Sequence, residues 1–164
     1  NVLLEWSRSL MFTSVFACDS REWELHWRIV AHALPLMSRI ARECVGKSPL
    51  CPRCHAAVED DVHFLWSCPW SQMVWDKCGH VIFVISRLIM EVDLSMVLCG
   101  VPRCGRQWRH VSLPVKVAVC NLVLGAKWLI WSMRNAALLS GRQPCIDVID
   151  VGLSSLLERS RQML

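Results

Sequence analysis

The sequence predicts a mainly α-helical protein in which helical segments surround one compact loop region. Apolar residues make up 54% of the 164 residues, which is ample material for a core, and over long stretches they recur every three or four residues. Residues 47–68, in contrast, are rich in proline, cysteine and charge. We therefore expect a helical N-terminal flank at residues 1–46, a compact loop with its following helix at residues 47–79, and a helical, basic C-terminal region at residues 80–164.

Two helices are predicted within residues 20–44. Because proline is costly in a helix interior, Pro35 divides the stretch into one helix that ends near Ala33 and a second from about Pro35 to Cys44. Gly46 then provides the stop signal. The apolar residues with helical spacing in this stretch are Trp23, Trp27, Val30, Leu34 and Met37.

A third helix is predicted to start at Pro69, because proline suits the first helical turn. We expect it to run to about Cys78 and to end at Gly79. Residues 80–92 are mostly branched and apolar, so their period does not separate a buried strand from a buried helix, but their length and helical neighbours favour a helix. Residues 99–114 predict a loop because they contain two glycines and two prolines.

The clearest predicted helix extends from Leu113 to Leu139. Ser112 can cap it, Pro114 fits its first turn and Gly141 can end it. Its apolar stripe consists of Val115, Val119, Leu122, Ala126, Ile130, Met133 and Ala137. A last helix is expected from about Ile146 to Met163, and its inward-facing residues are Ile149, Leu153, Leu156 and Leu157.

One motif carries chemistry, and its residues are Cys51, Cys54, His63 and Cys68. The first two cysteines are two residues apart, so a tight turn can present both to one side of an ion. The histidine and the third cysteine can close the other side. Zinc binds four such ligands as a tetrahedron, and four protein ligands leave no open position for a reacting water. The sequence therefore predicts a small Cys-Cys-His-Cys zinc knuckle with structural Zn²⁺ as its cofactor.

Other thiols and imidazoles offer alternatives to this assignment. Cys51 and Cys54 could form a redox pair, although the strand–helix unit expected beside one is not predicted. His55 could compete as a ligand, and Cys78 with His80 could form a second half-site. The remaining cysteines are expected to be free thiols or ordinary core or surface residues: Cys18, Cys44, Cys99, Cys104, Cys120 and Cys145.

Basic residues are concentrated in the C-terminal half, where no Asp or Glu occurs between Leu94 and Ile146. Lys and Arg neutralise phosphates and exposed Trp stacks on unpaired bases, so this stretch favours an RNA- or DNA-facing surface. Lys116, Lys127 and Arg134 fall within about 20° of each other on one predicted helix face. A solvated basic face with its Trp residues in the core is the alternative. The candidate nucleic-acid-binding residues are Arg53, Arg103, Arg106, Arg109, Lys116, Lys127 and Arg134.

The sequence predicts neither secretion nor a membrane partner. Glu5 and Arg8 interrupt the first apolar stretch too early for a signal peptide. A spanning helix needs roughly 20 residues largely free of charge, whereas residues 115–131 include two lysines. We expect an intracellular protein, nuclear or cytoplasmic. The chain begins at Asn1, so we also expect a piece of a longer polyprotein.

Several runs of residues, which together extend over about residues 23–139, form a recognisable pattern. The runs are Trp27-Arg28-Ile29, Ala33-Leu34-Pro35, Cys51-Pro52-Arg53-Cys54, His63-Phe64-Leu65-Trp66, Cys68-Pro69, Val74-Trp75 and the stretch from Ala126 to Asn135. This pattern resembles the zinc-binding domain that follows the reverse transcriptase in polyproteins of non-LTR (long interspersed) retrotransposons.

This resemblance implies a zinc knuckle that grips RNA or DNA, with an upstream reverse transcriptase domain of the same polyprotein as a further partner. Catalysis is not expected, because a polymerase needs spaced carboxylates for two metal ions. The single Asp-Asp pair, Asp60 and Asp61, lies inside the loop and is interpreted as solvated charge. The alternatives are a structural or protein-interaction domain that docks on a missing polymerase domain, or a fragment without function.

Overall fold

The computed structural model describes residues 19–87, 92–99, 108 and 110–162, with the side chains of Ser95 and Cys99 excepted. Within these residues the fold is mainly α-helical, as the sequence predicts, and its β pairing is one isolated antiparallel bridge between Leu50 and Val58. The helical elements are α2 (Ser20–Val30), α3 (Met37–Glu43), the π-helical turn η1 (His63–Ser67), α4 (Pro69–Ser86), α5 (Leu94–Cys99), α7 (Leu113–Ser140) and α8 (Ile146–Arg161).

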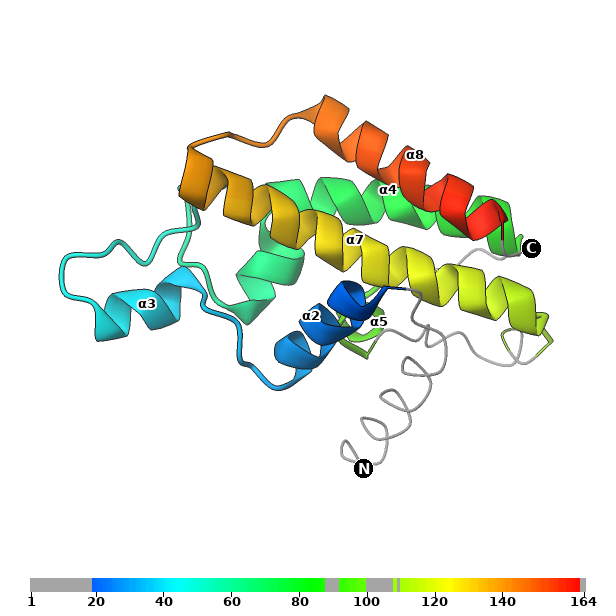
Figure 1. Ribbon diagram of the computed structural model, residues 1–164, viewed down its shortest axis with the longest axis horizontal. Helices are drawn as coiled ribbons and strands as arrows, with labels where there is room; N and C mark the ends of the chain where they lie inside the picture. The colour runs from blue at the N-terminus through cyan, green and yellow to red at the C-terminus, as the bar shows by residue number, and fades with distance from the viewer. Residues whose placement is uncertain (1–18, 88–91, 100–107, 109, 163–164) are drawn as a thin grey trace.

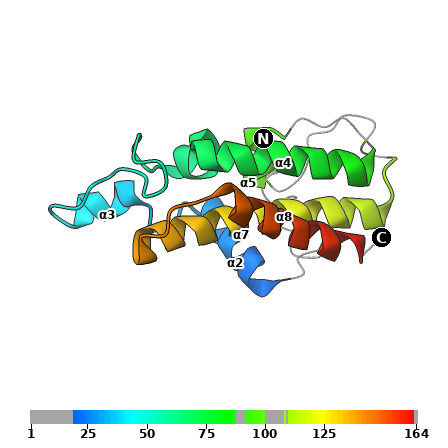
Figure 2. The ribbon, with the colours of Figure 1, turned by 90° about the horizontal axis from the view of Figure 1, so that it is seen from above.

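Helix α7 is the centre of the arrangement, and α2, α4 and α8 pack around it (Figures 1 and 2). Helix α3 and the loop that follows it project from the end of the bundle where α7 finishes. The chain thus consists of a helical body and a smaller cysteine-containing extension at one end.

The predicted division of the N-terminal stretch at Pro35 is confirmed. Helix α2 ends at Val30 and α3 starts at Met37, so the proline lies in the connection. The side chain of Asp19 caps α2 by accepting a hydrogen bond from the backbone N–H of Arg21, at 2.8 Å. The connection between the two helices lets α2 pack on α7 while α3 lies away from the bundle (Figure 1).

The prediction that Gly79 ends a helix is wrong, because α4 continues through it to Ser86. A glycine costs only about 1 kcal/mol within a helix, and the burial of Cys78 and Ile82 on either side of it outweighs that cost. The helix ends instead at Arg87, which adopts a left-handed conformation with φ 57°. Residues 80–86 therefore belong to α4, and the expected segment boundary after residue 79 is not a break in structure.

Helix α7 agrees with the prediction to within one residue, and Gly141 ends it with φ 62°. Ser112 occupies the N-cap position, but its side chain makes no capping hydrogen bond, so that detail of the prediction is wrong. The predicted apolar stripe is buried from Val119 to Ala137, while Val115 is half-buried. Helix α8 approaches α7 closely at Gly125, where a Cβ would lie 2.2 Å from Leu156.

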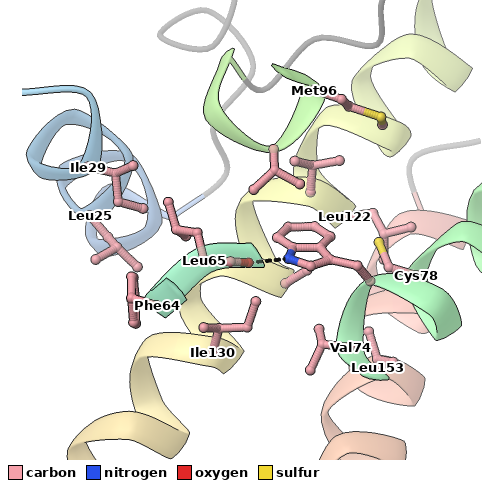
Figure 3. Packing of buried hydrophobic residues seen from close by; sticks show 14 of the residues in the cluster. Leu25, Ile29, Phe64, Leu65, Val74, Cys78, Met96, Leu122, Ile130 and Leu153 are labelled. Carbon is pink, nitrogen blue, oxygen red and sulfur yellow. Dashed lines mark hydrogen bonds between the residues drawn. The ribbon is translucent and has the colours of Figure 1, made fainter. Parts of the chain in front are cut away.

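One continuous core joins all three predicted segments. Leu25 from α2, Phe64 from η1 and Leu153 from α8 belong to a single buried cluster (Figure 3). Within it the indole N–H of Trp75 donates to the carbonyl of Leu65 at 2.6 Å, a hydrogen bond that Figure 3 marks. This bond satisfies the polar atom of a buried Trp and fixes η1 against α4.

By length and composition, α7 is also the one helix in the described residues that could cross a membrane, so its two lysines alone do not exclude a span. Its most apolar stretch has a mean hydropathy of 1.6, and 61% of that stretch is buried inside the fold. The core helix of a soluble protein passes the same test, and α7 is enclosed by three other helices.

The carboxylate of Glu59, which is wholly buried, attaches the projecting loop to the body. Its oxygens accept from the backbone N–H of Met37 at 2.8 Å and from the guanidinium of Arg134 at 3.2 and 3.0 Å. Arg134 also donates to the carbonyl of Pro35 at 2.8 Å. A single ion pair therefore joins the loop, the start of α3 and the centre of the bundle.

We predict that Glu59→Gln or Arg134→Met destabilises the protein by about 3–5 kcal/mol, because either change leaves one buried charge uncompensated. Arg28→Met is the matched control, since the Arg28–Glu24 pair is more than half exposed and its loss should cost less than about 1 kcal/mol. Urea unfolding of all three variants at one metal content measures this. Equal losses in the control and the buried variants would contradict the role given to Glu59.

Candidate metal centre

The first two candidate ligands lie in a tight turn between the two sides of the Leu50–Val58 bridge. The backbone N–H of Cys51 donates to the carbonyl of Ala57 at 2.8 Å, and that of His55 donates to the carbonyl of Cys51 at 2.9 Å. His55 adopts a left-handed conformation with φ 56°, which turns the chain back toward the bridge. The turn therefore presents Cys51 and Cys54 from one short segment.

The second pair of ligands is placed by η1. The side chain of Asp60 accepts from the backbone N–H of His63 at 2.7 Å, which starts the turn, and the N–H of Cys68 donates to the carbonyl of His63 at 3.0 Å, which closes it. Cys68 is also the N-cap of α4, and its carbonyl accepts from Ser71 and Gln72. The rigid α4 thus holds one ligand and η1 holds the other.

The ligand atoms of Cys51, Cys54, His63 and Cys68 lie within 4.8 Å of one another. Cys54 Sγ is 3.3 Å from His63 Nε2, Cys51 and Cys68 are fully buried, and His63 is 8% exposed. In a tetrahedral site with Zn–S bonds of about 2.3 Å, two sulfurs are separated by about 3.8 Å. The spacing and the donor set therefore fit one metal ion.

The surroundings of the cluster shift the pKa values of two of its thiols in opposite directions. A hydrogen bond from the Cys68 thiol and the backbone N–H groups of Cys54 and Arg53 hold the pKa of Cys51 well below its usual range, although burial opposes this. The same thiol–thiol bond, together with burial, raises the pKa of Cys68. Ser67 Oγ lies 3.4 Å from His63 Nδ1, where it can accept a hydrogen bond from the Nδ1–H group when Nε2 binds the ion.

The structure separates this set from the other metal ligands that the sequence left open. His55 is exposed and its ring lies near Gln143, outside the cluster. Cys78 is buried in the core, where burial raises its pKa to about 12, while His80 is exposed and lies 2.9 Å from the carbonyl of Asp76, so they form no half-site. Cys120 is buried, whereas Cys44 and Cys145 are exposed. Cys18, Cys104 and the Cys99 side chain lie outside the described residues.

Three of the expected nucleic-acid contacts are corrected by the structure, because Arg53, Lys127 and Arg134 are each no more than 2% exposed. Arg134 pairs with Glu59, and Lys127 Nζ lies 2.8 Å from His26 Nδ1. The helix face that carries both residues packs inside the bundle, so neither side chain faces a phosphate. Lys116 is half-buried near the start of α7. Arg103, Arg106 and Arg109 lie outside the described residues.

The two aspartates interpreted as solvated charge also have partners within the fold. Asp60 is exposed and accepts from the backbone N–H of His63, and the partly buried Asp61 accepts from the guanidinium of Arg39 at 2.5 Å and lies 3.3 Å from the ring of His32. The spacing of Asp60, three residues before His63, is that of a helix cap and could have been recognised in the sequence. The pairing of Asp61 with Arg39 joins residues 22 positions apart, and no local pattern indicates it.

Comparison of the chain with models of protein families, with curated proteins and with solved structures gave no match. The geometry of the cluster therefore carries the functional argument. Four protein ligands fill the coordination shell of a tetrahedral ion, so the arrangement can hold an ion and cross-link the chain, with no position left for a metal-bound water.

We predict that alkylation distinguishes three classes among the described cysteines. Cys44 and Cys145 should react in the folded protein because they are exposed, and the three cluster cysteines should react only after a chelator removes the metal. Cys78 and Cys120 should resist in both conditions, since burial raises their pKa to about 12 and little thiolate forms. Iodoacetamide labelling followed by peptide mass spectrometry measures this. Cluster cysteines that react as fast as Cys44 without chelator would contradict metal binding.

Proposed function

We propose that the protein is a structural zinc-binding module in which Zn²⁺ fixes the projecting loop in its folded shape. The convergence of Cys51, Cys54, His63 and Cys68 carries this proposal. Three thiolates and one imidazole in a tetrahedral, closed arrangement suit Zn²⁺ better than Mg²⁺ or Ca²⁺, which prefer oxygen ligands in larger coordination shells. The module has no catalytic role of its own.

The exposure of the loop explains why a metal is needed there. Residues 42–50 are all exposed, and Val45 is entirely so, so this part of the chain buries almost no apolar surface. Ordering such a segment costs conformational entropy that a small core cannot offset. The free energy of metal binding becomes folding free energy for such a segment.

We predict one zinc ion per purified chain, measured by elemental analysis. Cys54→Ala and His63→Ala should abolish stoichiometric zinc and unfold the region around residues 47–68, because an incomplete site binds zinc far more weakly. Cys120→Ala is the matched control, since it removes a buried thiol outside the cluster and should cost at most about 2 kcal/mol while zinc is retained. Zinc loss in the control, or zinc retention in both ligand variants, would contradict the assignment.

We further propose that the module belongs to the carboxyl end of a retrotransposon reverse transcriptase polyprotein and acts inside the cell. The residue runs that carry the resemblance support this, and members of those runs have structural roles here. Leu34 is buried, Arg134 binds Glu59, and Trp75 bonds to Leu65. An upstream reverse transcriptase domain would then be a partner, and the exposed apolar side chains of Trp27 and Val151 are available to it.

Nucleic-acid binding is the second candidate function, and a groove of about 150 Å³ between α2 and α7 favours it. Arg21, Arg28, Trp128 and Trp131 are among the residues that line this groove. The guanidinium of Arg21 lies 5.6 Å from the centre of the Trp128 ring, and both arginines are at least half exposed. Their partners Asp19 and Glu24 form surface ion pairs, which are weak enough for phosphates to compete.

We predict salt-dependent binding of single-stranded RNA at this groove, with a slope of about −0.7 in log K against log salt for each phosphate neutralised. Arg21→Gln with Arg28→Gln should weaken binding and reduce the slope by about 1.4. Arg42→Gln with Arg161→Gln is the charge-matched control on exposed positions outside the groove. If RNA does not bind at low salt, or if the control weakens binding equally, the groove is not the binding site, and docking to a protein domain remains as the alternative.

A further inference from the structure

Arg53 is a buried cation without a carboxylate partner among the described residues. Its side chain is 2% exposed, and its guanidinium donates to Ser71 Oγ at 2.9 Å and to the carbonyl of Phe64 at 2.7 Å. Both acceptors are neutral, and Nε has no hydrogen-bond partner. A buried charge is costly unless an opposite charge lies near it, so the position of Arg53 requires an explanation.

The proposed zinc complex near Arg53 carries an uncompensated charge of the opposite sign. Three thiolates and one neutral imidazole around a divalent ion carry one net negative charge, because metal ligation requires the cysteines to be deprotonated. Cys51 and Cys68 are wholly buried, so water does not solvate most of this charge. Arg53 lies in the turn between two ligands, Cys51 and Cys54, and its guanidinium donates to the carbonyl of Phe64, which follows the ligand His63.

We propose that Arg53 is the counter-charge of the metal centre, a positioning residue whose cation balances the net negative charge of the zinc–thiolate complex. The proposal rests on the zinc-binding function proposed above. It explains why a guanidinium is buried here without a carboxylate, since the zinc–thiolate complex supplies the compensating negative charge. It also explains why Arg53 is unavailable to a phosphate.

Other buried cations do not offer this charge to the site. Arg134 is compensated by Glu59, and Lys127 lies against His26 in the bundle. Arg53, by contrast, reaches both of the elements that present the second pair of ligands. Its guanidinium donates to the carbonyl of Phe64, next to His63, and to Ser71, three residues after Cys68. Its neutral partners, together with the Phe64 ring 5.3 Å away, fix the guanidinium without cancelling its charge.

A purely mechanical role for Arg53 is the competing explanation. Its two hydrogen bonds connect the Cys51–Cys54 turn to η1 and to Ser71 on α4, and losing them would loosen the site whatever its charge. The two explanations differ in one respect. A counter-charge matters only while the complex is negative, whereas an anchor matters equally for a neutral complex.

The test measures zinc affinity by competition with a chelator in two backgrounds, the natural Cys₃His site and a Cys54→His site, whose zinc complex is neutral. We expect Arg53→Met to lower the affinity about 10- to 100-fold in the natural background, as typical for residues that surround metal ligands, and less than about 3-fold in the neutral one. Arg42→Met, an exposed control, should change neither. Co²⁺ spectra confirm tetrahedral coordination in each protein.

The outcomes separate the two proposals. An equal loss of affinity in both backgrounds overturns the counter-charge and leaves Arg53 as an anchor. If the Cys54→His protein does not bind zinc, the zinc affinity of Arg53→Lys in the natural background distinguishes the explanations. Lysine keeps the positive charge but not the planar group that makes both hydrogen bonds. A smaller loss than in Arg53→Met supports the counter-charge, and an equal loss overturns it. Failure of the unaltered protein to bind zinc overturns the zinc-binding function itself.

Discussion

The buried carboxylate of Glu59 is the interaction on which the placement of the metal centre depends. The carboxylate accepts hydrogen bonds from the backbone N–H of Met37 and from the guanidinium of Arg134. The backbone N–H of Glu59 donates to the carbonyl of Pro49. Glu59 follows the Leu50–Val58 bridge directly and precedes the cap of η1, so fixing it fixes the approach of both ligand pairs. Because neither charge of a buried pair is stable alone, the loop and the bundle are expected to assemble together.

The body is stabilised mainly by apolar packing, and the extension mainly by polar contacts and the proposed metal. The body has a continuous apolar core in which α7 is enclosed by three helices. The extension has little apolar burial around residues 42–50 and relies on polar attachments. Structural zinc sites contribute about 10–16 kcal/mol in small peptides, which is comparable to the stability of a whole domain. Metal loss should therefore affect the extension first and the bundle less.

The sequence contains much of this structure, and the exceptions have a common cause. The apolar stripe of α7, the division at Pro35 and the spacing of the four ligands are local patterns, and each is found in the fold where predicted. The extent of α4 beyond Gly79 is not local, because burial of Ile82 against other helices outweighs the glycine. Likewise, no local signal shows that Glu59, 75 residues away, covers Arg134. The spacing of apolar residues in the sequence identifies the buried face of a helix, but it does not identify the residues that pack against that face.

The same limitation changes how the basic character of the chain is interpreted. The run of cations without acids in the sequence favours a polyanion-facing surface, yet Arg53, Lys127 and Arg134 are buried against partners inside the fold. Arg134 pairs with Glu59, Lys127 contacts His26, and Arg53 donates to Ser71 and to the carbonyl of Phe64. Three of the seven candidate phosphate contacts thus serve the fold. The proposed nucleic-acid site therefore depends on other residues, the exposed Arg21 and Arg28 and the partly buried Trp128 and Trp131 that line the groove between α2 and α7.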